Sequence, residues 1–66
     1  MTRPPVTMAD LVPGTKVRHD RWGDTGTIRV IGGVTEIRWD EHIGEMEVSP
    51  EGPVRPGDLT IIGGTR

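Results

Sequence analysis

The 66-residue chain has no cysteine, phenylalanine or tyrosine, and Trp22 and Trp39 are its only large aromatic side chains. Without cysteine, the protein can form no disulfide, thiolate zinc site or cysteine nucleophile. No apolar run approaches the roughly 20 residues that a membrane-spanning helix needs. Residues 1–10 also lack the apolar stretch of about 7 residues found in secretory signals. We therefore predict one small domain, with no membrane contact, in the cytoplasm.

The formal net charge is −2, and it is unevenly distributed along the chain. Residues 1–33 have a net charge of +2, whereas residues 34–66 have a net charge of −4. Sequence-blind binding to nucleic acid depends on cations that displace counterions from phosphates. The overall charge argues against such binding, and a nucleic-acid partner would have to contact the first half.

Ten glycines and six prolines divide the chain into short segments, none with helical spacing over three turns. We predict a flexible leader over 1–10, where Pro4-Pro5 disfavours helix and strand, a folded domain over 11–62 and a frayed end over 63–66. Period-two alternation and β-branched residues predict five strands, with a single helical turn at 55–58 before the last. The expected strands are 15–20, 26–31, 34–39, 45–49 and 59–62.

Gly32-Gly33 is the strongest local signal, because both glycines can adopt the positive φ of a primed two-residue turn. This turn fixes a register in which Arg29 faces Glu36 and Ile28 faces Ile37. One face of the hairpin then holds the apolar residues, and the other holds an ion pair. The expected core face comprises Ile28, Val30, Ile37 and Trp39.

Five short strands without a long helix are typical of a small, strongly bent all-β barrel, since a flat sheet would leave an apolar face wet and its edges open. Val17 and His19 are expected inside on the first strand, and Met46 and Val48 inside on the fourth. A chain this short is near the lower limit for burying its own core. A homo-oligomer therefore stays open as an alternative.

Four segments together resemble the SH3-like barrel superfamily, in particular its tudor, KOW and mind bomb-type branches and similar small actinobacterial or phage proteins. They are Pro13-Gly14-Thr15-Lys16-Val17-Arg18-His19, Gly26-Thr27-Ile28, Ile37-Arg38-Trp39-Asp40 and Asp58-Leu59-Thr60-Ile61-Ile62. The resemblance spans most of residues 11–62 and implies a five-stranded SH3-like barrel. Members of the superfamily mostly bind peptides, modified side chains, nucleic acid or RNA polymerase, so it indicates binding without naming the partner.

A second resemblance is to the type II dihydrofolate reductases, in which four SH3-like subunits enclose a catalytic pore. It rests on Gly14 to Arg18, Gly26 to Ile28 and Glu47-Val48-Ser49-Pro50. That family has Gln and Tyr where this chain has Glu47 and Ser49, so four carboxylates would meet anionic ligands in the pore. An oligomeric pore enzyme is kept as an alternative, but we predict that the protein is not an enzyme and needs no cofactor.

Trp22 is the leading candidate for contact with a partner. It lies in a polar loop beside Arg21, where an aromatic side chain serves either as a binding platform or as a lid over the open end of the barrel. Trp39 shares the parity of Ile37 and is expected in the core. We predict a non-catalytic module that binds another protein through Trp22 and neighbouring loops.

The alternative partner is nucleic acid, bound by a cation cluster around Trp22. The predicted binding residues Lys16, Arg18, Arg21 and Arg29 lie on the first two strands and the loop between them, as in KOW domains. Alternatively, these basic residues only make the surface soluble, because Asp20, Asp24 and Glu36 partly neutralise their charge.

His19 and His42 invite a metal hypothesis together with nearby carboxylates. Their spacing matches no established ligand motif, and a His19 bonded to backbone on the inner face is the simpler interpretation. The carboxylates Asp40, Glu41, Glu45 and Glu47 have no enclosed cleft in which to act as an acid/base pair, so they are expected to form a solvated acidic face. We predict no metal site.

Overall fold

The computed structural model describes residues 4–64 and consists of five short strands with two 3-10 turns. In chain order the elements are η1 Met8–Asp10, β1 Lys16–His19, β2 Thr25–Ile31, β3 Val34–Trp39, β4 Glu45–Glu47, η2 Pro56–Asp58 and β5 Leu59–Gly63. All five expected strands are present, and so is the helical turn before the last one. The prediction of an all-β protein is confirmed.

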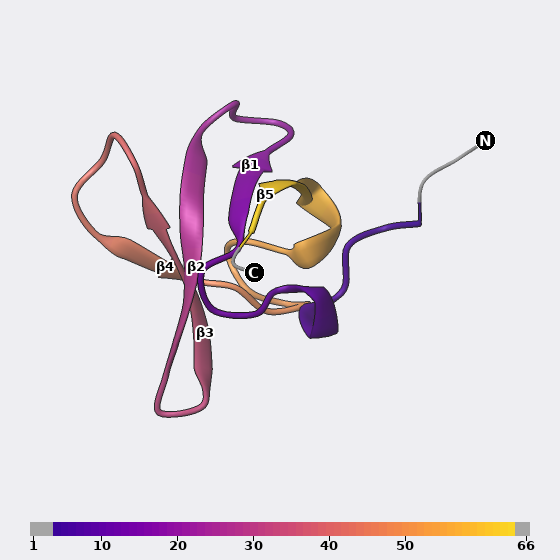
Figure 1. Ribbon diagram of the computed structural model, residues 1–66, viewed down its shortest axis with the longest axis vertical. Coiled ribbons are helices and arrows are strands. Elements are labelled where there is room, and N and C mark those ends of the chain that lie inside the picture. The colour runs from indigo at the N-terminus through magenta and orange to yellow at the C-terminus, as the bar shows by residue number, and fades with distance from the viewer. Residues whose placement is uncertain (1–3, 65–66) are drawn as a thin grey trace.

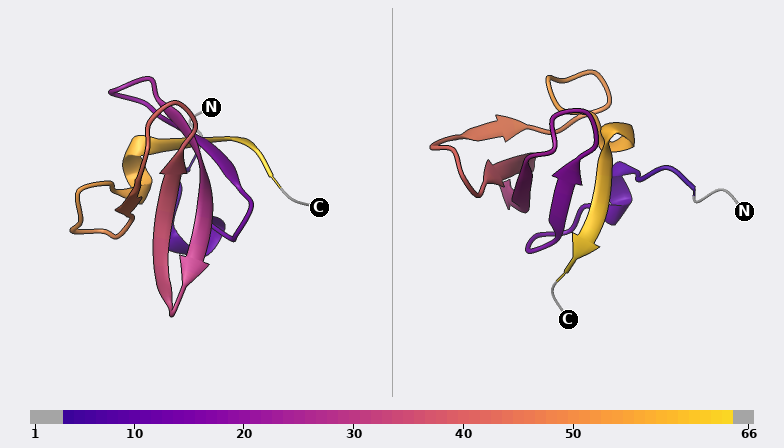
Figure 2. Two further views of the ribbon diagram at one scale, coloured as in Figure 1. Left: turned by 90° about the vertical axis from the view of Figure 1, so that its left-hand side faces the viewer. Right: turned by 90° about the horizontal axis from the view of Figure 1, so that it is seen from above.

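The strands form one antiparallel sheet in the order β4-β3-β2-β1-β5. The sheet twists strongly, so that β4 and the tip of the β2–β3 hairpin extend away from β1 and β5 (Figures 1 and 2). The sheet is not closed, because within residues 4–64 no ladder joins β4 to β5. In place of closure, a single parallel bridge between Val48 and Val54 ties the segment after β4 to the segment before η2.

The β2–β3 hairpin has the predicted register: Arg29 faces Glu36, and Ile28 faces Ile37. Gly32 and Gly33 form the turn with φ of 57° and 80°. Ile28, Ile37 and Trp39 are buried as expected, but Val30 is 41% exposed. Val30 lies on the predicted face, yet near the tip of the hairpin it extends past the elements that could cover it, so its expected burial is wrong.

The core lies between the twisted sheet and the segments that cross its ends. Trp39 is the only large aromatic in it, at 8% exposure, and His19 lies beside this apolar cluster at 2%. Met46 is only partly buried, whereas Val48 is fully inside. The buried apolar residues are Leu11, Val17, Ile28, Ile37, Trp39, Val48, Val54 and Leu59.

The described part of the predicted leader contains the 3-10 turn η1. The backbone N–H and hydroxyl of Thr7 donate hydrogen bonds of 2.9 and 3.1 Å to the Asp10 carboxylate, which closes the 3-10 turn η1. Val6 and Met8 pack against the core. The described part of the leader therefore covers apolar surface that the sheet leaves open. Residues 1–3, 65 and 66 lie outside the described residues.

Candidate functional site

Trp22 lies in the loop between β1 and β2 and is 51% exposed. The predicted location, on a polar loop outside the core, is therefore confirmed. Its indole stacks on the buried His19 ring with centroids 3.8 Å apart and planes 6° from parallel. Trp39 lies 6.0 Å from Trp22, tilted by 54°. One indole face of Trp22 is thus supported by the protein.

His19 also fixes the backbone of this loop. Its Nδ1 accepts hydrogen bonds from the backbone N–H groups of Arg21 and Trp22, both at 3.3 Å. The backbone N–H of His19 donates to the Asp24 carbonyl at 2.8 Å, and the N–H of Gly23 donates to the His19 carbonyl at 2.7 Å. The expectation that His19 is an inward residue bonded to backbone is confirmed, with the added finding that it positions Trp22.

A second set of contacts ties the loop to the other end of the chain. The backbone N–H of Asp20 donates to the Asp58 carbonyl at 2.8 Å, and the hydroxyl of Thr60 donates to the Asp20 carboxylate at 2.6 Å. The loop is therefore hydrogen-bonded at both ends, which restrains the backbone at Trp22. Such preorganisation reduces the entropy cost of binding.

Trp22 borders a hollow of about 310 Å³ between the β1–β2 and β3–β4 loops, which we call the tryptophan hollow. Its walls combine aromatic and aliphatic side chains with two carboxylates. His42 Nε2 lies 3.6 Å from Asp24 Oδ1, so the two loops also approach each other at its rim. The lining residues are Trp22, Asp24, Trp39, His42, Ile43, Gly44, Glu45 and Met46.

Trp22 also borders a second hollow of about 260 Å³. This hollow is mostly polar, and it brings Arg21 beside Arg55 and Asp58. Arg21 was a predicted binding residue, and the structure places it next to Trp22 but in this second hollow. Arg55, in the irregular segment before η2, was not predicted as a neighbour, because only the fold brings it to the β1–β2 loop.

Two of the four predicted binding cations are engaged in ion pairs. Lys16 Nζ lies 3.1 Å from Asp40 Oδ1, and Arg29 Nε lies 3.4 Å from Glu36 Oε1. Arg29 faces Glu36 across the hairpin as the sequence predicted. These carboxylates offset the charge that both cations would present to a phosphate backbone.

Arg18 and Lys16 lie on the outer face of β1, opposite the buried Val17. Arg38 on β3 shares that outer face, because Lys16 pairs with Thr27 on β2 and Thr27 pairs with Arg38. Arg38 was not among the predicted binding residues, although its alternation with Ile37 and Trp39 was a usable signal. Arg21 and Trp22 lie in the loop, away from this row of strands.

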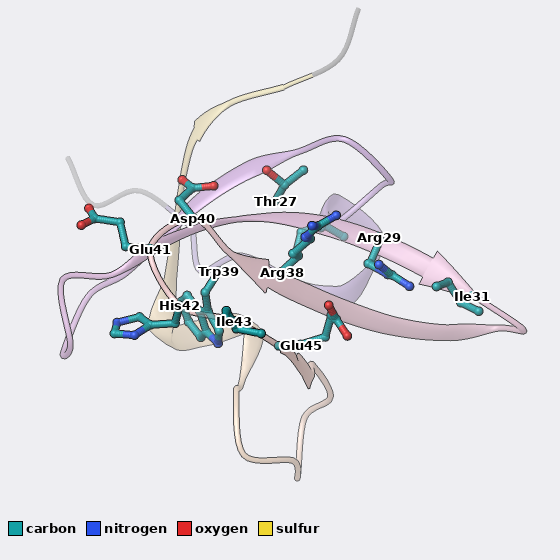
Figure 3. Close-up of a pocket in the computed structure, with 12 residues that line it drawn as sticks. Thr27, Arg29, Ile31, Arg38, Trp39, Asp40, Glu41, His42, Ile43 and Glu45 are labelled. Carbon is teal, nitrogen blue, oxygen red and sulfur yellow. The ribbon is translucent and has the colours of Figure 1, made fainter.

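A larger hollow, of about 960 Å³, runs along the outer face of the β2–β3 hairpin to the β3–β4 loop. Figure 3 shows Arg29 and Arg38 on the same side of the hairpin, with Glu41 and His42 at the far end. This hairpin groove contains both signs of charge and the exposed residue Ile31. Trp22 does not line it.

Asp40 is the best-connected carboxylate of this region. Its Oδ2 accepts a hydrogen bond of 2.8 Å from the Thr25 hydroxyl and one of 3.2 Å from Lys16 Nζ. The hydrogen bond from Thr25, followed by that from Lys16, holds the pKa of Asp40 below its ordinary value of 3.8. Asp40 therefore acts as a structural tie between β1, β2 and the end of β3.

Two further kinds of feature are absent from residues 4–64. No group of three or more His, Asp or Glu side chains in this range is arranged to hold a metal ion. In the same range, no helix has the length and apolar character needed to cross a membrane.

Comparisons of the chain with protein-family models, with curated proteins and with solved structures found no match.

Proposed function

We propose that the protein is a non-catalytic interaction module with an SH3-like arrangement of strands, and that it binds another protein in the cytoplasm through Trp22 and the neighbouring loops. The SH3-like assignment is supported by five short antiparallel strands in a strongly twisted sheet and by a 3-10 turn directly before the last strand. It requires no cofactor and no metal.

The observation that supports the binding role is a half-exposed tryptophan on a rigid base. Trp22 stacks on a buried histidine, and its loop is held by hydrogen bonds from both ends. Exposed tryptophans are over-represented among the residues that dominate protein interfaces, and a preorganised one costs less to bind. The hollows on either side of the indole give a partner places to insert its own side chains.

A library of displayed random peptides, selected on the protein, tests this proposal. Trp22→Ala should lower the affinity for the selected peptides roughly 30-fold or more, the loss expected for an interface residue that contributes about 2 kcal/mol. Trp22→Phe should retain part of the affinity, because phenylalanine can still stack on His19. Circular dichroism of each variant shows whether the fold is retained.

Ile31→Thr is the matched control, because Ile31 is also 51% exposed but lies at the tip of the hairpin. It should leave the affinity unchanged. Peptides that bind wild type and Trp22→Ala equally well would contradict the proposal, and peptides sensitive to Ile31→Thr would move the site to the hairpin groove.

Nucleic acid is the second candidate, and the shared outer face of Lys16, Arg18 and Arg38 favours it. It ranks lower because Asp40 and Glu36 pair with cations of that region. A short DNA duplex at physiological salt should show no binding. Micromolar binding that weakens steeply with salt and is lost in Arg18→Gln would reverse the ranking.

A further inference from the structure

The tryptophan hollow has a charge that restricts what can enter it. Asp24 and Glu45 are its two carboxylates, and within residues 4–64 no lysine or arginine lines it. Among the described residues, His42 is the one other titratable side chain in its lining, and its Nε2 lies 3.6 Å from Asp24 Oδ1. A ligand group that enters this hollow therefore meets two negative charges, which repel a phosphate or carboxylate and attract a cation.

The indole of Trp22 adds a geometric preference. His19 covers one of its faces at 3.8 Å, so a partner group that stacks on the indole has to approach the opposite face. The face of an indole attracts cations through its quadrupole. A planar cation gains more than a compact one, because it can stack on the ring while its N–H groups point toward carboxylates.

From these observations we infer that the tryptophan hollow takes the guanidinium of an arginine side chain in a partner peptide, stacked on Trp22 and paired with Asp24 or Glu45. The inference rests on the proposed function and narrows it to one ligand chemistry. The apolar walls from Ile43 and Met46 suit the methylene stem that leads to a guanidinium.

The second, polar hollow beside Trp22 is less suited to a guanidinium than the tryptophan hollow. It holds Arg21 and Arg55 against the single carboxylate of Asp58, so it does not favour a cation. A peptide arginine is thus directed to the side of Asp24 and Glu45. A nucleobase could also stack on Trp22, but its attached phosphates would lie near the same two carboxylates.

The first experiment uses N-acetyl-arginine amide as the probe, with two-dimensional NMR of the isotope-labelled protein. Resonances of the Trp22 indole, Asp24 and Met46 should shift on titration. N-acetyl-citrulline amide, which has the same shape without the charge, should cause no such shifts, and the lysine analogue should cause smaller ones. Equal shifts with citrulline would overturn the inference.

Matched charge variants locate the site. Asp24→Asn and Glu45→Gln should each weaken the arginine response several-fold. Glu47→Gln removes the same charge two residues further along β4, where the side chain does not line the tryptophan hollow, and should leave the response unchanged. Equal losses in all three variants would show only general attraction to an acidic protein, which overturns the inference.

The second experiment separates failure of the inference from failure of the proposed function. In peptides selected on the protein, replacing arginine with citrulline should weaken binding roughly tenfold, an effect comparable to a partly desolvated cation–π contact. Peptides that depend on Trp22 but contain no arginine would overturn the inference and leave the proposed function standing. An oligonucleotide that shifts the Trp22 resonances more than any peptide would overturn both.

Discussion

The ring centroids of the two tryptophans lie 6.0 Å apart, yet one ring is held in the core and the other on a surface loop. Trp39 ends β3 and is held in the core by strand register, with Gly26 opposite it on β2. Trp22 is held outside the core by one histidine and a short loop. The comparison shows that a 66-residue chain with two large aromatics uses one for stability and presents the other on a fixed support.

Truncating each tryptophan in turn is the sharpest test of their different roles. Trp39→Ala should lower the free energy of unfolding by about 3–5 kcal/mol, because it empties a buried aromatic site. A domain of this size has a total stability of about 3–10 kcal/mol, so this loss removes a large part of it. Trp22→Ala should cost only about 1 kcal/mol, mainly the lost ring stacking. Thermal unfolding measures both, and a larger loss for Trp22→Ala would invert the two roles.

Two glycines give the next largest contrast. A Cβ at Gly26 would lie 2.6 Å from the Arg38 carbonyl oxygen and 2.8 Å from Ile37 Cγ1, so Gly26→Ala should cost about 1–3 kcal/mol through overpacking. Gly23, beside Trp22, has open space around it but a φ of +79°. Gly23→Ala should cost about 1–2 kcal/mol through backbone strain alone.

Urea unfolding measures the loss of stability in each glycine variant, and NMR chemical shifts separate the two causes. Gly26→Ala should shift resonances in the core around Trp39, whereas Gly23→Ala should shift only the β1–β2 loop. Core shifts in Gly23→Ala would show that the two regions are not independent.

The support under Trp22 is tested by His19→Phe. Phenylalanine retains a ring for stacking but cannot accept the backbone N–H groups of Arg21 and Trp22. Leaving these donors without a partner should cost about 1–2 kcal/mol. Amide hydrogen exchange at these two residues should accelerate while exchange in β2 and β3 changes less. Unchanged exchange at Arg21 and Trp22 would show that the loop does not depend on His19.

The smallest effect concerns Asp40, which ties β1 and β2 to the end of β3. Its lowered pKa means that the folded state favours the carboxylate, so its contribution is present at neutral pH and is lost as the pH falls through that lowered pKa. Asp40→Asn should lower the melting temperature slightly at pH 7. The difference from wild type should shrink below about pH 4. A difference that is constant down to strong acid would exclude this titration.

The sequence predicted the parts of the fold that depend on local pattern. Gly32-Gly33 fixed the hairpin register because only positive φ at both positions gives that turn, and alternation then placed Ile37 and Trp39 inside. The exposed position of Trp22 followed from its polar neighbours. The burial of Val30 was mispredicted because side-chain alternation predicts which face of the strand a residue lies on. It does not predict how much of that face is covered by other segments.

The candidate site itself was only half predictable. Trp22 and Arg21 were identified from the sequence, but the acidic wall formed by Asp24 with Glu45, and the polar hollow with Arg55, join segments that are far apart along the chain. The Lys16–Asp40 pair likewise links residues 24 positions apart. No local pattern specifies such neighbours, because they depend on how the long connections return.

By itself, then, the amino-acid sequence determined the strand segments, the tight hairpin and which tryptophan points inward, since each depends on backbone preferences and side-chain alternation over a few residues. Only the tertiary structure decided that the sheet stays open, that Val48 pairs with Val54 and that Trp22 stands between an acidic and a mixed-charge hollow. These features depend on packing between distant segments, because the twist of the sheet and the burial of a small core determine which loops contact each other.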